Sequence, residues 1–116
     1  IRDVERSRGL GDVYKRQPVS LLHPDHYVLQ VKGNSMIDEQ IHDKDYIVAR
    51  KTNTARSGQI VVALINGEAT LKYYVQGPGG VELHPRNPDF PIIKVESKDD
   101  FHINGVLLYS FRNYLN

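Results

Sequence analysis

The chain has 116 residues, a formal net charge of +1 and no cysteine. This length suits a single domain with one core. The absence of cysteine excludes a disulfide framework and is consistent with the reducing cytoplasm, where we expect the protein to act. No run of residues approaches the roughly 18 consecutive apolar residues of a membrane span, so we expect no membrane partner.

The first seventeen residues differ in character from the rest. Asp12 to Gln17 resembles the in-frame translation of a transposon end that is used to prepare sequencing libraries. We therefore expect residues 1–17 to be non-native read-through or a disordered arm, and residues 18–116 to form the domain. The alternative is a natural basic arm suited to nucleic acid. Without this segment the chain has 10 basic and 11 acidic residues, a balance that gives no electrostatic footprint for nucleic acid.

The remaining sequence predicts an all-β fold. Short apolar or alternating runs are bounded by turn pairs such as Asn66-Gly67 and Pro88-Asp89. We expect compact, multi-stranded twisted sheets or a partial barrel, with at most one or two short helical turns, at 36–41 and 54–57. The run from Ile60 to Ile65 is apolar on both faces and should be central. The expected strands are Tyr27–Lys32, Asp45–Lys51, Gln59–Ile65, Ala69–Val75, Val81–Leu83, Ile92–Val95 and Phe101–Arg112, the last either continuous or broken at Asn104-Gly105.

Two short segments carry the main candidate chemistry. Ser35 lies in the Gly33 to Met36 turn directly after the first expected strand, and Lys72 lies in a mostly apolar strand. A serine hydroxyl becomes a good nucleophile when a base within roughly 2.6–3.2 Å accepts its proton. A lysine is such a base once burial has lowered its pKa from about 10.4. Ser35 and Lys72 are therefore a candidate nucleophile and base.

Each of these residues also has an ordinary explanation. In a strand, alternation places Lys72 on one face with Thr70 and Tyr74, which predicts either a half-dry pocket or a wet surface. Ser35 follows glycine and asparagine, a composition that is common in plain turns. Neither residue alone identifies a site.

A metal site is a second candidate. His23 and His26 flank a Pro-Asp pair near the start of the expected domain. No matching His or Cys pair follows them, as the usual patterns of zinc ligands require. We therefore expect no metal ion and no other cofactor.

A catalytic triad and an acid pair are the remaining candidates. A Ser-His-Asp triad would place His42 or His84 beside Ser35, and nothing in the sequence fixes that geometry. Asp43 and Asp45 stand two residues apart at a strand entrance. This spacing is typical of turn chemistry, so we do not expect an acid pair for catalysis.

The last strand suggests a surface for a partner. Leu107, Tyr109 and Phe111 share one face of this strand, while Ser110 and Arg112 share the other. The aromatic side chains either complete the core or form an interface with a second copy. The sequence leaves both interpretations open.

The order of these segments points to a known family. A strand, the Gly33 to Met36 turn, a short irregular segment and an Asp-x-Asp turn are followed by a second strand. Three later runs complete the pattern, namely Gly58–Ala63, Glu68–Lys72 and Leu83–Pro88. Over about Tyr27 to Phe111 this combination closely resembles the C-terminal domain of the LexA repressor family of self-cleaving proteins. The fold that the resemblance implies is the β fold shared by LexA and signal peptidase.

The resemblance implies a role for each candidate residue. Ser35 matches the nucleophile that attacks an Ala-Gly bond, Lys72 matches the general base, and the backbone amides of Ser35 and Met36 match the oxyanion donors. In this family a filament of RecA on single-stranded DNA stimulates cleavage of the chain by its own site. Cleavage separates an operator-binding domain from the domain that forms the homodimer, which derepresses DNA-damage genes.

The chain departs from the family pattern at its N-terminus. No helix-turn-helix is visible before Pro18, and no Ala-Gly pair occurs. We therefore expect a truncated copy that reaches operator DNA only through a missing N-terminal domain. The alternatives are a UmuD-type accessory protein of error-prone DNA polymerase, a phage repressor of the same superfamily, or a non-catalytic β dimerisation module. A signal peptidase has similar Ser/Lys chemistry but works at a membrane.

Overall fold

The computed structural model describes residues 2–3 and 23–112. These residues form the 3-10 turn η2 (Ile37–Glu39) and the strands β1 (Arg2–Asp3), β2 (His26–Gln30), β3 (Tyr46–Lys51), β4 (Ile60–Ile65), β5 (Glu68–Gly77), β6 (Gly80–His84), β7 (Ile93–Lys94) and β8 (Phe101–Phe111). The prediction of an all-β fold is confirmed. The prediction for residues 1–17 falls outside the described residues, apart from the backbone of β1. The described part of the chain has no helix that could span a membrane.

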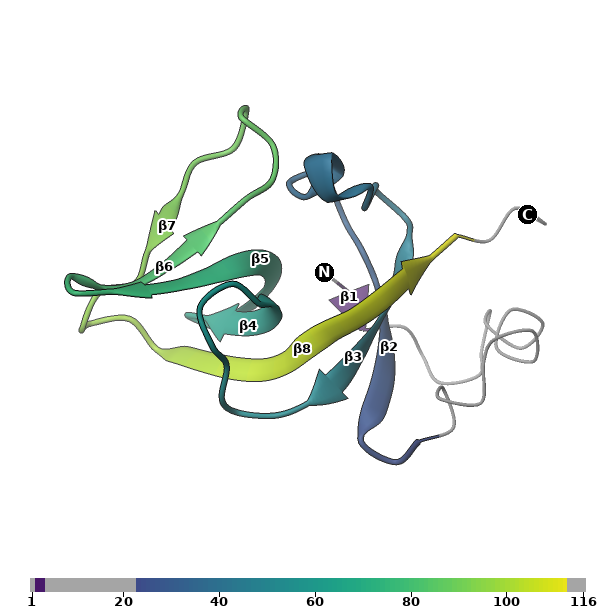
Figure 1. The fold of residues 1–116 in the computed structure, drawn as a ribbon, viewed down its shortest axis with the longest axis horizontal. Helices are drawn as coiled ribbons and strands as arrows, with labels where there is room; N and C mark the ends of the chain where they lie inside the picture. Colours follow the sequence, from purple (N-terminus) through teal and green to yellow (C-terminus); the bar gives the residue numbers. More distant parts are fainter. Residues whose placement is uncertain (1, 4–22, 113–116) are drawn as a thin grey trace.

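All described strands belong to one antiparallel sheet. Their order is β1-β2-β3-β8-β4-β5-β6-β7. The long strand β8 pairs with β3 on one side and with β4 on the other, so it links the β1 to β3 part of the sheet with the β4 to β7 part (Figure 1). The strand β4 lies between β8 and β5, which confirms the central position expected from its apolar sequence.

The strand β8 is continuous, with a bulge where the sequence allowed a break. Its pairing with β4 passes from Gly105 directly to Ile103, so Asn104 is an extra residue in the ladder. The Tyr27 hydroxyl donates a hydrogen bond of 3.0 Å to the Asn104 carbonyl. A bulge leaves such a carbonyl without its ladder partner. The strand therefore continues through the Asn-Gly pair.

Only one of the two expected helical turns forms. Residues 37–39 make η2, which ends at Gln40 in a left-handed conformation with φ of 63°. Residues 54–57 form no helix, and the chain there turns at Ser57 and Gly58. This turn is held by the Gly58 amide, which donates to the Tyr74 carbonyl at 2.9 Å. A contact with β5 thus replaces local helical bonding.

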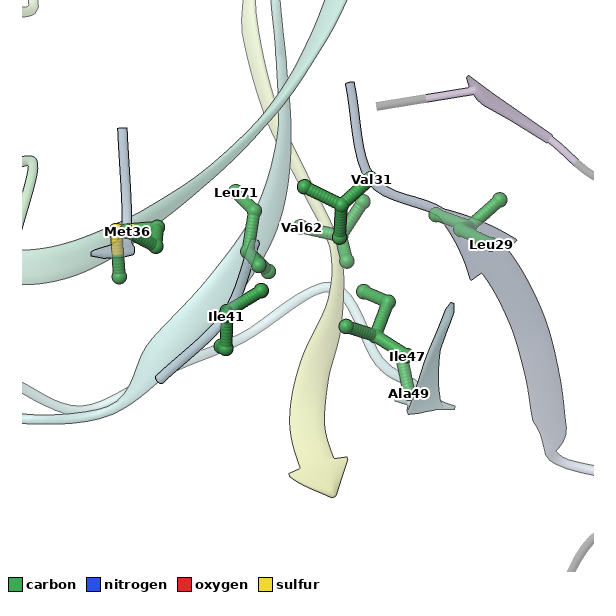
Figure 2. Close-up of a cluster of buried hydrophobic side chains, with 8 residues drawn as sticks. All are labelled: Leu29, Val31, Met36, Ile41, Ile47, Ala49, Val62 and Leu71. Atoms are coloured by element: carbon green, nitrogen blue, oxygen red, sulfur yellow. The ribbon is translucent and has the colours of Figure 1, made fainter. Parts of the chain in front are cut away.

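Apolar side chains pack on both faces of β4. One cluster contains the buried Val62 and the residues Leu29, Val31, Met36, Ile41, Ile47, Ala49 and Leu71 (Figure 2). The other cluster contains Val61, Ala63, Tyr74, Leu83, Ile103 and Val106. Met36, only 1% exposed, joins the first cluster from the turn that carries Ser35. The core therefore anchors the candidate site directly.

The end of β8 is neither fully buried nor fully open. Leu107, Tyr109 and Phe111 are half-buried, and the Phe111 ring stacks on Tyr46 with centroids 5.3 Å apart. A second bulge at Leu108 leaves that side chain 41% exposed. This partial burial is compatible both with a role in the core and with an interface with a second copy.

Candidate active site

The turn after β2 presents Ser35 at a fixed position. Gly33 has a φ of 90°, a conformation that glycine adopts at little cost. The Asp43 carboxylate accepts a hydrogen bond of 2.6 Å from the Gly33 amide, and the Asn34 side chain accepts one of 2.9 Å from the Asp43 amide. Asp43 therefore stabilises the turn, as its spacing predicted. Ser35 itself is half-buried.

Lys72 lies in the middle of β5 and points toward Ser35. Its side chain is buried, with the residue only 8% exposed. The Lys72 Nζ is 3.0 Å from Ser35 Oγ and 2.6 Å from Thr70 Oγ1. Thr70 and Lys72 pair with Ala63 and Val61 of β4, on the face of the second apolar cluster. The structure thus brings the two residues of the predicted pair within hydrogen-bond distance.

Burial changes the acid strength of Lys72. Desolvation is the largest effect and lowers the pKa of its ammonium below the ordinary value of 10.5. The negative charge of Glu68 acts in the opposite direction and raises it by a smaller amount. Lys72 is therefore more readily deprotonated than a lysine in water. A neutral amine at this position can accept the proton of Ser35 Oγ.

Two backbone amides adjoin the serine hydroxyl. The amides of Ser35 and Met36 donate none of the hydrogen bonds found among the described residues. The carbonyls on either side are occupied, since Asn34 O accepts from Ile37 N at 3.3 Å and Ser35 O accepts from Arg86 N at 2.7 Å. The turn therefore offers two amide donors next to a serine hydroxyl, an arrangement suited to binding an oxyanion.

The segment after β6 supports this turn and was not singled out as functional from the sequence. The Arg86 amide donates to Ser35 O, and the Arg86 carbonyl accepts from the Asp38 amide, both at 2.7 Å. The Arg86 guanidinium lies 3.8 Å from the centroid of the Tyr73 ring and donates to Glu39 at 3.2 Å. The only local signal of this role is the turn composition of the Pro-Arg-Asn-Pro run.

Asp45 belongs to a structural ion pair. It is 3% exposed and accepts hydrogen bonds from Arg112 Nε at 2.6 Å and from a second Arg112 nitrogen at 2.9 Å. Burial acts to raise its pKa, but the hydrogen bonds from Arg112 and from the His42 amide outweigh this effect and lower it below 3.8. Asp45 is therefore a paired carboxylate that ties the end of β8 to the loop before β3.

Three of the histidines contact groups other than Ser35 and Lys72. His84 is 2.9 Å from Glu82 and pairs with Tyr73 across the ladder, so it occupies the opposite face of β5 from Lys72. The rings of His23 and His26 stack on each other with centroids 4.4 Å apart. Within the described ranges, no group of three or more His, Cys, Asp or Glu residues is placed to hold a metal ion.

The chain is similar to known proteins over most of its length. Residues 7–108 match the model of the Peptidase S24-like family, a match that begins inside the segment 1–17. The chain is 44% identical over 105 residues to the LexA repressor of Syntrophotalea carbinolica, covering 90% of this chain and 52% of the relative. It is 42% identical over 91 residues to the LexA repressor of Paracidovorax citrulli, covering 78% of this chain and 41% of the relative.

A third relative shows the same relationship. The LexA repressor of Xylella fastidiosa strain M23 is 41% identical over 120 aligned positions, covering 90% of this chain and 57% of the relative. The chain thus spans about half the length of these curated relatives. The family match covers most of the chain, including the turn of Ser35 and the strand of Lys72. This chain belongs to the Peptidase S24-like family.

Proposed function

We propose that this chain is the self-cleaving peptidase and dimerisation domain of a LexA-type repressor of the DNA-damage response. One observation carries the proposal: a buried lysine with a lowered pKa places Nζ 3.0 Å from the hydroxyl of a turn serine. This geometry supplies a nucleophile and its base without a metal or cofactor. The relatives named LexA repressor supply the biological context.

The proposed reaction begins with a proton transfer. Neutral Lys72 Nζ accepts the proton of Ser35 Oγ as that oxygen attacks the carbonyl carbon of the Ala-Gly bond. The carbonyl oxygen becomes an oxyanion that the amides of Ser35 and Met36 stabilise. Thr70 Oγ1, 2.6 Å from Nζ, keeps the amine directed at Ser35 during this step.

The second half of the reaction returns the enzyme to its starting state. The Lys72 ammonium protonates the glycine nitrogen as the carbon-nitrogen bond breaks, which leaves an ester on Ser35. Lys72, neutral again, then activates a water molecule that hydrolyses this ester. Because no Ala-Gly pair occurs in this chain, the proposal places the substrate bond elsewhere, in a segment of the longer repressor.

The partners follow from the same proposal. The proposed homodimer forms through β8, where Tyr109 and Phe111 are half-buried and Leu108 is 41% exposed, so apolar surface is left for a second copy. A RecA filament on single-stranded DNA is proposed to stimulate cleavage by favouring the docked position of the substrate segment. Operator DNA would be held by a further domain, because the charge balance of residues 18–116 gives no nucleic-acid surface.

The test supplies the missing substrate. Residues 1–17 are replaced by a linker that contains Ala-Gly, and intact mass is followed from about pH 7 to 10, where a lysine with a lowered pKa titrates. We expect cleavage at Ala-Gly that accelerates with pH. It should be lost in Ser35→Ala, in Lys72→Ala and in Lys72→Arg, because guanidinium stays protonated.

Matched controls separate chemistry from folding. Ser97→Ala and Lys51→Ala change exposed residues of the same types and should cleave like the parent. RecA filaments should accelerate the parent and leave Ser35→Ala inactive. A folded parent that does not cleave with or without RecA filaments would overturn the proposal and favour a non-catalytic dimerisation module.

A further inference from the structure

The segment that follows β6 holds the serine turn from outside. Besides the two backbone hydrogen bonds of Arg86, the Asn87 side chain donates from Nδ2 to the Asn34 carbonyl at 2.8 Å. Asn34 and Asn87 are far apart in the sequence, so this is a long-range support of the turn. The Asn87 amide group is itself oriented, because its Oδ1 accepts a hydrogen bond of 2.9 Å from the Asp89 amide.

These contacts fix the two peptide planes that matter for an oxyanion. The Asn34 carbonyl shares a peptide unit with the Ser35 amide, and the Ser35 carbonyl shares the next unit with the Met36 amide. The described residues contain no cis peptide bond. In a planar trans unit the C=O and N–H bonds point in opposite directions. Because residues 86–87 hold both carbonyls, the amides of Ser35 and Met36 point away from residues 86–87.

Two hydrogen bonds anchor these carbonyls, one from Arg86 and one from Asn87, and they differ in how they depend on the residue type. The Arg86 anchor on Ser35 O is a backbone amide, which almost every residue type provides. The Asn87 anchor on Asn34 O is a side-chain amide, so it depends on the residue at that position. Ile37 N also donates to Asn34 O, at the longer distance of 3.3 Å. Asn87 is thus the anchor of the Ser35 amide that a substitution can remove.

We propose that Asn87 is a positioning residue that orients the Ser35 amide toward the substrate oxyanion. This inference rests on the proposed peptidase function. Donors fixed before the reaction stabilise developing charge at no cost of reorganisation during it. The proton transfer between Ser35 and Lys72 does not involve Asn87, so the two roles are separable by experiment.

The test uses a fluorophosphonate, which reads Ser35 reactivity in the full chain without a peptide substrate. Ser35 Oγ forms a bond to phosphorus, the phosphorus-fluorine bond breaks, fluoride leaves, and Lys72 takes the hydroxyl proton. The phosphoryl oxygen occupies the oxyanion position, so the rate depends on the amide donors. Modification is followed by intact mass, and Ser35→Ala defines the background.

Two variants remove the anchor in different ways. Asn87→Asp keeps an acceptor for the Asp89 amide and loses the donor to Asn34 O, whereas Asn87→Ala loses both without adding charge. We expect both to slow labelling by about 10- to 100-fold, less than deletion of a whole oxyanion donor. Asn53→Asp adds the same charge at an exposed position and should label at the parent rate.

The pH profile distinguishes positioning from general damage. For Asn87→Ala we expect the same pH midpoint as the parent, because the contacts of Lys72 with Ser35 and Thr70 are retained. A shifted midpoint, or labelling within threefold of the parent, would overturn the inference. A parent that is never labelled at Ser35 would instead overturn the proposed function.

Amide NMR spectra test the role of Asn87 even if the parent protein is never labelled at Ser35. With ¹⁵N-labelled protein, Asn87→Ala should shift or broaden the Ser35 amide resonance more than that of Met36, whose peptide plane Arg86 still holds. An unchanged Ser35 resonance in folded Asn87→Ala would show that Asn87 does not fix this plane. Asn53→Asp should leave both resonances in place.

Discussion

Lys72 Nζ lies closer to Thr70 Oγ1, at 2.6 Å, than to Ser35 Oγ, at 3.0 Å. Thr70 and Lys72 are two positions apart in β5, so their side chains lie next to each other on one face of the strand. Thr70 therefore has two effects on the amine. It fixes the direction of Nζ, and its hydroxyl oxygen stabilises the protonated form by accepting a charge-assisted hydrogen bond.

The variant Thr70→Val tests both effects with a side chain of similar shape. We expect cleavage at high pH to slow by about tenfold, less than the roughly 10²- to 10⁴-fold contribution of the general base itself, because Thr70 only directs that base. We also expect the pH midpoint to move downward, because loss of an acceptor for the ammonium lowers the pKa of Lys72 further. Rates from pH 7 to 10 check both expectations. Thr70→Ser should retain the midpoint, and an upward shift in Thr70→Val would contradict the assignment.

A second prediction concerns the stability cost of Lys72. The folded protein releases the Lys72 proton at a lower pH than the unfolded chain, because burial lowers the pKa from 10.5. Between these two pKa values the unfolded state binds more protons, so the free energy of unfolding rises with pH. Below the folded pKa the cost of burying the ammonium is present in full.

Lys72→Met should remove this cost and the activity together. We expect the free energy of unfolding at pH 7 to increase by about 0.5–2 kcal/mol, the usual gain from a single stabilising substitution. The rise in stability at alkaline pH should also flatten. Urea unfolding at several pH values measures both quantities. Lys51→Met, at an exposed position, is the matched control, and equal behaviour of the two variants would contradict the prediction.

The main parts of this site were predictable because they depend on local patterns. Ser35 follows a strand and a glycine turn, and Lys72 interrupts an apolar strand, so both stand out in the sequence. The predicted strand boundaries lie close to the observed ones, because alternation and turn pairs mark where strands begin and end. The contact between Ser35 and Lys72, 37 positions apart, was expected only from the family resemblance, since no spacing rule predicts it.

The supporting contacts were not predictable for a physical reason. Asn87 reaches a backbone carbonyl 53 positions away, and Arg112 reaches Asp45 across 67 positions. Each depends on the register of strands that the chain must first form. The Asn104-Gly105 pair was ambiguous because the same dipeptide suits a turn and a bulge, and only the contact with Tyr27 decides between them.

A third prediction concerns the pair between Asp45 and Arg112. The hydrogen bonds of Arg112 lower the Asp45 pKa against the effect of burial. The pair therefore contributes stability above the unfolded pKa of 3.8, and this stability is lost as the pH falls through the lower folded value. Because the Arg112 side chain is 40% exposed, we expect Arg112→Met to cost about 1–3 kcal/mol at pH 7, less than loss of a fully buried partner.

Urea unfolding as a function of pH checks this expectation. In Arg112→Met the Asp45 carboxylate keeps the effect of burial and loses its partner, so its pKa should rise and the cost should shrink in acid. The double variant Asp45→Asn/Arg112→Met should be less destabilised than the sum of the single variants, because no charge is left buried. Additive costs would show that the two side chains act independently.

A final prediction concerns Gly105, which lies beside the bulge of β8. A Cβ at this position would collide with the Tyr27 hydroxyl and lie 3.0 Å from the Arg50 carbonyl. The Tyr27 hydroxyl lies here because it donates a hydrogen bond to the Asn104 carbonyl. Because backbone and ring must both move, we expect Gly105→Ala to lower the free energy of unfolding by about 1–3 kcal/mol, the usual cost of overpacking.

Removing the hydroxyl identifies the cause of this loss. Tyr27→Phe deletes the atom nearest to the added Cβ, while the ring carbon that bears the hydroxyl and the Arg50 carbonyl remain close. We expect Gly105→Ala to cost less in the Tyr27→Phe background than in the parent, which a double-mutant cycle by urea unfolding measures. Gly79→Ala, where an added Cβ meets no atom within 4 Å, is the control. An equal cost in both backgrounds would place the strain at the Arg50 carbonyl and the ring carbon, since the hydroxyl would then contribute nothing.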